Sequence, residues 1–146
     1  MSTRHCLTVF VFLLALTGCA ARNELLANQQ KWAAQNVSHY KYDLTISCFC
    51  PWSDLMPLKV EVKDGQVISM TDKAGQPTPA SYADTFNRAA TVEGLFEILD
   101  SALGSARKVT VEYDPAYGYP KSTHIDYSMA TDDETGYIVE NFEVLK

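Results

Sequence analysis

The feature that most constrains the fold is a strict alternation of side chains from His39 to Cys50. One set of alternate positions is mainly apolar: Tyr40, Tyr42, Leu44, Ile46, Cys48 and Cys50. The other set is mainly polar: His39, Lys41, Asp43, Thr45, Ser47 and Phe49. A period of two over this length predicts a strand of an antiparallel sheet, with one face buried and the other in water. Pro51 lacks an N–H donor and is expected to end this strand.

The clearest helical pattern follows Thr91, a residue type that caps helix N-termini. Its apolar residues recur three and four positions apart: Val92, Leu95, Phe96, Leu99, Ala102 and Leu103. This spacing predicts a helix with one buried face, and Gly104 is expected to end it. A second helix is predicted over Asn23 to Gln35, capped by Asn23, with Trp32 packed on the domain.

The segments 58–63 and 66–71 alternate on either side of Asp64-Gly65, which predicts a β-hairpin. A two-residue turn would pair Val62 with Val67. A three-residue loop, with Gly65 as a bulge, would instead pair Val60 with Ile68 and Leu58 with Met70. The second register gathers the apolar side chains on one face, so we expect the three-residue loop.

Three further strands are predicted over 107–114, 121–127 and 136–145, and the phase of the last one is unclear from the pattern. The inward residues expected in the first two are Val109, Val111, Tyr113, Thr123, Ile125 and Tyr127. Residues 72–90 are predicted to be a long connection in which Tyr82 and Phe86 pack down. The order α-β-β-β-α-β-β-β predicts one α+β domain over 23–146, with an antiparallel sheet of about six strands and two helices, and the helix after Thr91 covering one face.

The N-terminus carries an apolar run, Leu7 to Thr17, after a short start that contains Arg4. The run is too short to span a bilayer, which takes about 20 residues, and it has the features of a secretory signal. Its end, Leu16-Thr17-Gly18-Cys19, resembles the lipobox of bacterial lipoproteins. The resemblance implies a signal peptide over 1–18, a lipid on Cys19, and an acylated tether over 19–22. Ala20, in the position after Cys19, favours the outer membrane facing the periplasm in a Gram-negative source.

The charge of the chain limits its partners. Asp and Glu outnumber Lys and Arg by 18 to 12, a net charge of −6, and removal of Arg4 with the signal peptide makes it −7. An acidic domain repels phosphate backbones, so nucleic acid is excluded as a partner class. It also gains nothing from anionic headgroups, so the lipid on Cys19 is the expected membrane contact.

Several short strings together resemble the bacterial "domain of unknown function 6174" family. They are Cys48-Phe49-Cys50-Pro51 after Tyr42, Val67-Ile68-Ser69 after Asp64-Gly65, Val92-Glu93-Gly94-Leu95-Phe96, Tyr113-Asp114-Pro115, and Gly118-Tyr119-Pro120. The resemblance covers most of residues 32 to 145. It implies an envelope domain, often a lipoprotein, and supplies no substrate, cofactor or catalytic residue.

Two cysteines would remain in an oxidising compartment once Cys6 is removed and Cys19 is acylated, namely Cys48 and Cys50. Residues two apart in a regular strand have Cα atoms about 6.6 Å apart, near the upper limit for a disulfide. A disulfide therefore requires a bent strand. We expect that the disulfide forms and that its role is structural. Two buried thiols are the alternative.

Other candidate sites in the sequence are weaker. Ser122, His124 and Asp126 alternate along one strand, which places them side by side rather than in a catalytic relay, so they are expected on a solvated sheet face with Thr110 and Glu112. A zinc site with His39, His124 and the two cysteines lacks the usual ligand spacing, and Asp132-Asp133-Glu134 lacks the pattern of a calcium loop. The tyrosines at 113, 117, 119 and 127 are expected to pack in the core rather than line a ligand groove.

No catalytic or metal-binding residue and no cofactor is predicted. The favoured interpretation is a lipid-anchored cell-envelope module with a non-enzymatic binding or structural role, whose partner is an envelope protein or the cell wall. The alternative is a thiol–disulfide or redox-sensing protein that uses Cys48-Phe49-Cys50.

Overall fold

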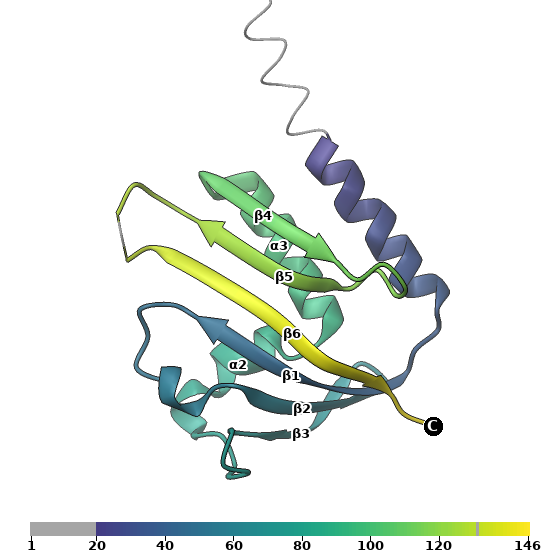
Figure 1. Ribbon diagram of the computed structural model, residues 1–146, viewed down its shortest axis with the longest axis vertical. Coiled ribbons are helices and arrows are strands. Elements are labelled where there is room, and N and C mark those ends of the chain that lie inside the picture. Colours follow the sequence, from purple (N-terminus) through teal and green to yellow (C-terminus); the bar gives the residue numbers. More distant parts are fainter. Residues whose placement is uncertain (1–19, 131) are drawn as a thin grey trace, which may run out of the picture.

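The computed structural model describes residues 20–130 and 132–146. The predicted signal peptide and the acylation site predicted at Cys19 lie outside the described residues. Within these residues, six antiparallel strands form one sheet in the order β3-β2-β1-β6-β5-β4 (Figure 1). Helices pack on one face of this sheet, so the α+β class predicted from the sequence is confirmed.

The C-terminal strand lies in the middle of the sheet. The strands are β1 (His39–Ser47), β2 (Leu58–Lys63), β3 (Gln66–Thr71), β4 (Lys108–Tyr113), β5 (Pro120–Asp126) and β6 (Glu134–Val144). The helices are an N-terminal helix over residues 20–34, α2 (Ala83–Ala89) and α3 (Val92–Ser105), with short 3-10 turns η1 (Ser53–Leu55) and η2 (Ala80–Tyr82). Because β6 pairs with both β1 and β5, it joins the β1–β2–β3 meander to the β4–β5 hairpin.

The alternation in β1 is confirmed as far as Ser47, and Tyr40, Tyr42, Leu44 and Ile46 are all buried. The strand ends there, so the prediction that it runs to Cys50 is wrong. The chain bends at Cys48 and Phe49 because a disulfide forms between Cys48 and Cys50, whose Cα atoms lie 5.2 Å apart. A straight strand could not bring the two sulfur atoms together as easily.

The β2–β3 hairpin has the predicted strands but a different register. Asp64 and Gly65 both have positive φ, and they form a two-residue turn that pairs Val62 with Val67. A bulge then shifts the register, so Val60 pairs with Met70 rather than with Ile68. The three-residue loop was therefore the wrong choice: a turn with two positive φ angles matches the strand twist, and the bulge realigns Met70 with the core while Ile68 stays exposed.

The helix boundaries differ from the predicted ones at several points. The N-terminal helix already includes residues 20–22, so Asn23 lies inside it and is not its cap. Thr91 caps α3 as predicted, since its Oγ1 accepts a hydrogen bond from Gly94 N at 3.0 Å. Helix α3 continues through Gly104 to Ser105, because the backbone N–H of Ala106 still bonds to Ala102 O.

Helix α2 was not predicted, because the prolines and glycine of the 72–90 connection suggested a loop. Its Phe86 and Ala89 are buried, and Phe86 packs against Tyr82 and Trp52 with ring centroids 5.7 Å apart in both pairs. The spacing of Tyr82, Phe86 and Ala89 is helical, so the signal was present in the sequence.

The unclear phase of β6 has a structural cause. Asn141 has a positive φ and lies at a bulge, where two residues of β6 face Tyr42 alone. The bulge places Phe142 against Tyr40 and Tyr42, and the ring centroids of Phe142 and Tyr119 are 4.5 Å apart. Alternation in β6 therefore breaks at the residue that brings an aromatic ring into the core.

The N-terminal helix packs closely on the domain. Leu25 and Trp32 are buried, Arg22 pairs with Asp100 of α3, and Lys31 donates a hydrogen bond to the carbonyl of Pro115. Gly118 has a φ of +86°, and a Cβ there would lie 2.9 Å from the carbonyl oxygen of Asn28. No helix in residues 20–130 or 132–146 is long and apolar enough to cross a membrane.

Candidate functional site

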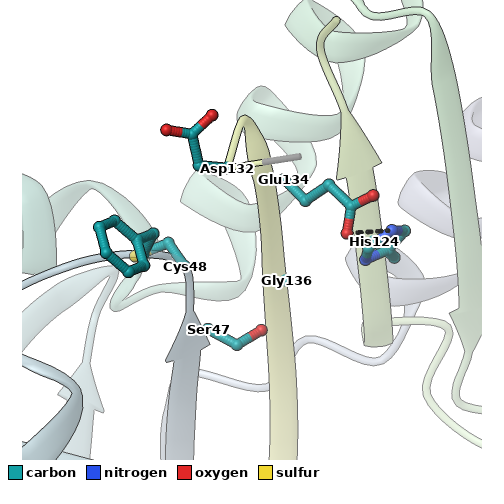
Figure 2. A pocket seen from close by; sticks show the side chains of 7 residues that line it. Ser47, Cys48, His124, Asp132, Glu134 and Gly136 are labelled. Carbon is teal, nitrogen blue, oxygen red and sulfur yellow. Dashed lines mark ion pairs between the residues drawn. The ribbon is translucent and has the colours of Figure 1, made fainter. Parts of the chain in front are cut away.

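A pocket of about 460 Å³ lies where the end of β1 meets the start of β6 (Figure 2). It is lined by Ser47, Cys48, Phe49, His124, Asp132, Glu134 and Gly136. These residues come from the end of β1, from β5, and from the β5–β6 connection with the start of β6. The pocket therefore joins two connections at one end of the sheet.

The floor of the pocket is a row across three strands. Gly136 of β6 pairs with Ser47 of β1 on one side and with His124 of β5 on the other. A Cβ at Gly136 would lie 2.4 Å from Ser47 Oγ, so the absence of a side chain leaves the space that the Ser47 hydroxyl occupies. In Figure 2 this hydroxyl points toward β6 at Gly136.

One rim of the pocket is formed by the cysteine pair. The sulfur atoms of Cys48 and Cys50 lie 1.91 Å apart, which fits the disulfide expected from the sequence. Cys48 packs partly against the core, and Cys50 lies beyond the end of β1. The alternation predicts both cysteines on the buried face, but each is only partly buried. The bond closes a loop with a single residue, Phe49, between the two cysteines.

Phe49 at the tip of this loop is 90% exposed. Met129, in the β5–β6 connection at the same end of the sheet, is exposed to the same extent (Figure 1). Single exposed apolar residues are common on protein surfaces, but Phe49 is exposed on a covalently closed loop beside a pocket. The alternation of β1 predicts Phe49 on the polar face of the strand and indicates no binding role for its ring.

The opposite rim carries negative charge. Asp132 and Glu134 line the pocket, and no lysine or arginine is among its lining residues. Glu134 Oε2 lies 3.6 Å from His124 Nε2, and both side chains are about half exposed. Figure 2 shows the Glu134 carboxylate turned toward His124, with Asp132 on the other side of the strand start. Such an exposed pair contributes little to stability. Because both side chains are about half exposed, their polar groups are accessible to a ligand.

Ser122, His124 and Asp126 do not form a catalytic relay. His124 pairs with Glu134, whereas Asp126 accepts a hydrogen bond from Arg107 Nη1 at 3.1 Å. Asp126 is also 8% exposed, so the prediction of a solvated position is wrong for this residue. The pair with Arg107 compensates the burial of Asp126 Oδ2, because a buried carboxylate needs a charged or hydrogen-bonding partner, whereas Oδ1 is buried without a partner among the described residues.

A second, polar groove of about 380 Å³ lies on the open face of the sheet. Its charged residues already pair with one another: Lys41 with Glu143, Lys59 with Asp43, and Asp43 also with the amide of Asn141. His39 is predicted on this face, and its Nε2 lies 2.8 Å from Oε1 of Glu61. Because its charged side chains pair with one another, this groove offers a ligand less unpaired charge than the pocket beside the disulfide does.

Three of the four tyrosines considered for a ligand groove belong to the core. Tyr119 is buried, and Tyr113 and Tyr117 are partly buried against the core. Tyr127 is 41% exposed, so the prediction that it points inward is wrong. Burial raises the pKa of both Tyr113 and Tyr119 to about 12, and the nearby Asp114 adds to the effect at Tyr119. Burial also raises the pKa of Tyr40 and Tyr42.

Among residues 20–130 and 132–146, no three His, Cys, Asp or Glu side chains are placed to hold a metal ion together. His39 and His124 each pair with a glutamate, from two different regions of the sheet.

Gly136 and Glu134 are residues that sequence reasoning did not connect with the cysteines. The phase of β6 was unclear, so its pairing with β1 was not foreseen. Their only signal in the sequence was the acidic stretch 132–134 followed closely by a glycine.

A family model described as a family of unknown function (DUF6174) matches residues 24–144. No curated protein and no solved structure matches the chain.

Proposed function

Because the chain belongs to the DUF6174 family of unknown function, its role has to be argued from its own residues, and we propose a lipid-anchored, non-enzymatic binding module of the bacterial cell envelope. The observation that carries this proposal is the end of the sheet around Phe49. There an exposed aromatic side chain lies beside a pocket that is lined by the carboxylates of Asp132 and Glu134 and by no lysine or arginine. Concave sites with a few polar groups are the usual places where proteins bind ligands.

The anchor would be Cys19, on the strength of Leu16-Thr17-Gly18-Cys19 after a basic and apolar leader. The N-terminal helix supports this arrangement, because residue 20 is already helical and Leu25 is buried against the domain. A lipid at Cys19 would therefore hold the domain close to the membrane through a docked helix rather than through a flexible spacer. Several acyl chains give stable attachment where one chain holds weakly.

Lipid attachment is tested by labelling with a radioactive fatty acid. The native chain should incorporate label and fractionate with membranes, and Cys19→Ser should lose both. Cys6→Ser is the matched control, since Cys6 lies within the predicted signal peptide and should not matter. Unchanged labelling of Cys19→Ser would exclude the proposed anchor.

Binding is tested by cross-linking in intact source cells, followed by purification of the chain and identification of what is attached. The native chain should give a reproducible complex with an envelope protein or with cell-wall material. Repeated trials that recover only the uncross-linked chain would count against a binding module.

The second candidate function is thiol–disulfide exchange, and the observation that favours it is the bonded, partly exposed Cys48–Cys50 pair. A disulfide near the surface is accessible to an attacking thiolate. An insulin-reduction assay separates the two functions. The binding module predicts no turnover above background, whereas rapid turnover that is lost in Cys48→Ser would establish the redox role.

A further inference from the structure

We propose that Phe49 is the anchor of a protein-docking surface whose partner is a polypeptide segment with an arginine or lysine next to an apolar side chain. This inference rests on the proposed binding function and specifies its site and its partner. The docking surface consists of Phe49, Ser47, Gly136, Asp132 and Glu134.

The first step concerns the presentation of Phe49. Cys48 is fixed on one side by its contact with the core at the end of β1. On the other side, Pro51 leads into Trp52, whose ring packs against Tyr82 and Phe86 with centroid distances of 5.2 and 5.7 Å. The disulfide joins Cys48 to Cys50 within the segment that these contacts of Cys48 and Trp52 hold in place. The Phe49 backbone therefore has little freedom, although the Phe49 side chain is in water.

The second step is energetic. A disulfide across one intervening residue restricts the unfolded chain only slightly, so its contribution to stability is small. Its larger consequence is local, because it orders an aromatic residue before any partner arrives. A residue whose backbone is already restricted loses less entropy on binding, and aromatic side chains, Trp and Tyr above all, are enriched among the residues that dominate interface energies. The bridge therefore fits a role in presenting Phe49.

The third step identifies the partner by charge. The pocket beside Phe49 is lined by two carboxylates, Asp132 and Glu134, and by no lysine or arginine, and His124 pairs with only one of them. An arginine or lysine side chain can pair with the carboxylates and lie against the Phe49 ring. An apolar neighbour in the same segment covers the ring, which would otherwise remain exposed.

The same charges argue against a lipid surface as the occupant. Phe49 could enter the headgroup region of a bilayer, but Asp132 and Glu134 beside it would then approach anionic phosphates. Like-charge contact of this kind is unfavourable, and the chain as a whole carries a net charge of −6. A cationic, apolar polypeptide satisfies both the ring and the carboxylates.

The test is a binding titration of the full chain in zwitterionic detergent micelles. The probes are three capped peptides of equal length, alternating leucine with arginine, leucine with glutamate, and serine with arginine. The leucine–arginine peptide should bind most tightly. Its Kd should rise at least about fivefold, or about 1 kcal/mol, in Phe49→Ser and in the pair Asp132→Asn with Glu134→Gln.

Two matched controls separate the site from general attraction to an acidic protein. Ile68→Ser removes an exposed apolar side chain of β3, and the pair Asp84→Asn with Glu97→Gln removes two exposed charges on the helices. Both should leave the Kd within about twofold. Melting temperatures of all variants confirm that each is folded.

The proposal is overturned if no peptide binds, if the glutamate peptide binds equally well, or if the control variants weaken binding as much as the site variants. A Phe49→Trp variant in phosphatidylcholine vesicles tests the lipid alternative. Quenching of the new indole by brominated lipid, with peptide binding unaffected by Phe49→Ser, would assign the surface to the membrane. If cross-linking captures a partner equally well from the Phe49→Ser chain, the binding module stands and this docking site does not.

Discussion

The indole Nε1 of Trp32 donates a hydrogen bond to Glu93 Oε1 at 2.8 Å, which ties the N-terminal helix to the first turn of α3. The other carboxylate oxygen of Glu93 lies 3.5 Å from the hydroxyl of Tyr40 in β1. The Trp32 ring packs nearly perpendicular to the rings of Tyr40, Tyr119 and Phe142, with centroid distances of 5.4 to 6.4 Å. The helix that would follow the lipid anchor is thus part of the core.

Trp32→Phe should lower the free energy of unfolding by about 1.5–3 kcal/mol beyond the effect of the smaller ring, because the bond to the Glu93 carboxylate is lost. Trp52→Phe is the matched control. Its Nε1 is buried without a hydrogen-bond partner among the described residues, so that substitution removes no hydrogen bond. Urea denaturation measures both values, and equal losses would show that the Trp32–Glu93 bond contributes nothing.

Phe96→Ala should cost about 3–5 kcal/mol, because Phe96 is 3% exposed and stacks on Tyr113 in the core under α3. Phe49→Ala removes the same atoms from the surface and should change stability by less than about 0.5 kcal/mol. Thermal melting of the two variants side by side is a direct comparison. A melting temperature unmoved by Phe96→Ala would mean that α3 does not form the core.

Stability should fall at alkaline pH. A free tyrosine titrates near pH 10, but burial raises the pKa of Tyr113 and Tyr119 to about 12. Between these values the unfolded chain loses protons that the folded chain keeps, so the stabilisation present below pH 10 is lost as pH rises toward 12. Melting temperatures measured across this range should decline less steeply for Tyr113→Phe. An identical decline would rule out a contribution from this phenol.

Removal of the disulfide should affect stability little. The double variant Cys48→Ser with Cys50→Ser should lose less than about 2 kcal/mol, since the closed loop holds one intervening residue. Mass spectrometry of the native chain with and without reductant should show the loss of one bridge. A loss of stability above about 3 kcal/mol would show that the bridge supports the fold rather than only its own loop.

The sequence predicted those parts of the fold in which apolar residues repeat with a clear period. The alternation in β1, the capped stripe of α3 and the limits of the β2–β3 hairpin were all present in the pattern. Errors arose where a local feature broke the period. The bulge at Asn141 hid the phase of β6, and a second bulge near Ile68 changed the hairpin register.

The site could be predicted only in part. The proximity of Cys48 and Cys50 follows from their spacing, so a disulfide was foreseeable. The pocket was not, because it depends on β6 entering the middle of the sheet and placing Gly136 between Ser47 and His124. Pairing between strands so far apart in sequence is decided by tertiary packing, and neither segment records it locally.

The most direct test of the central claim is site-specific photo-cross-linking in intact source cells. A photoreactive phenylalanine analogue is placed at position 49 of the full chain and, as a control, at position 68, where Ile68 is also exposed. We predict a discrete adduct with an envelope polypeptide from position 49, none from position 68, and loss of the adduct in Cys19→Ser. Absence of any adduct from position 49, or the same adduct from both positions, would contradict a lipid-anchored module that binds through Phe49.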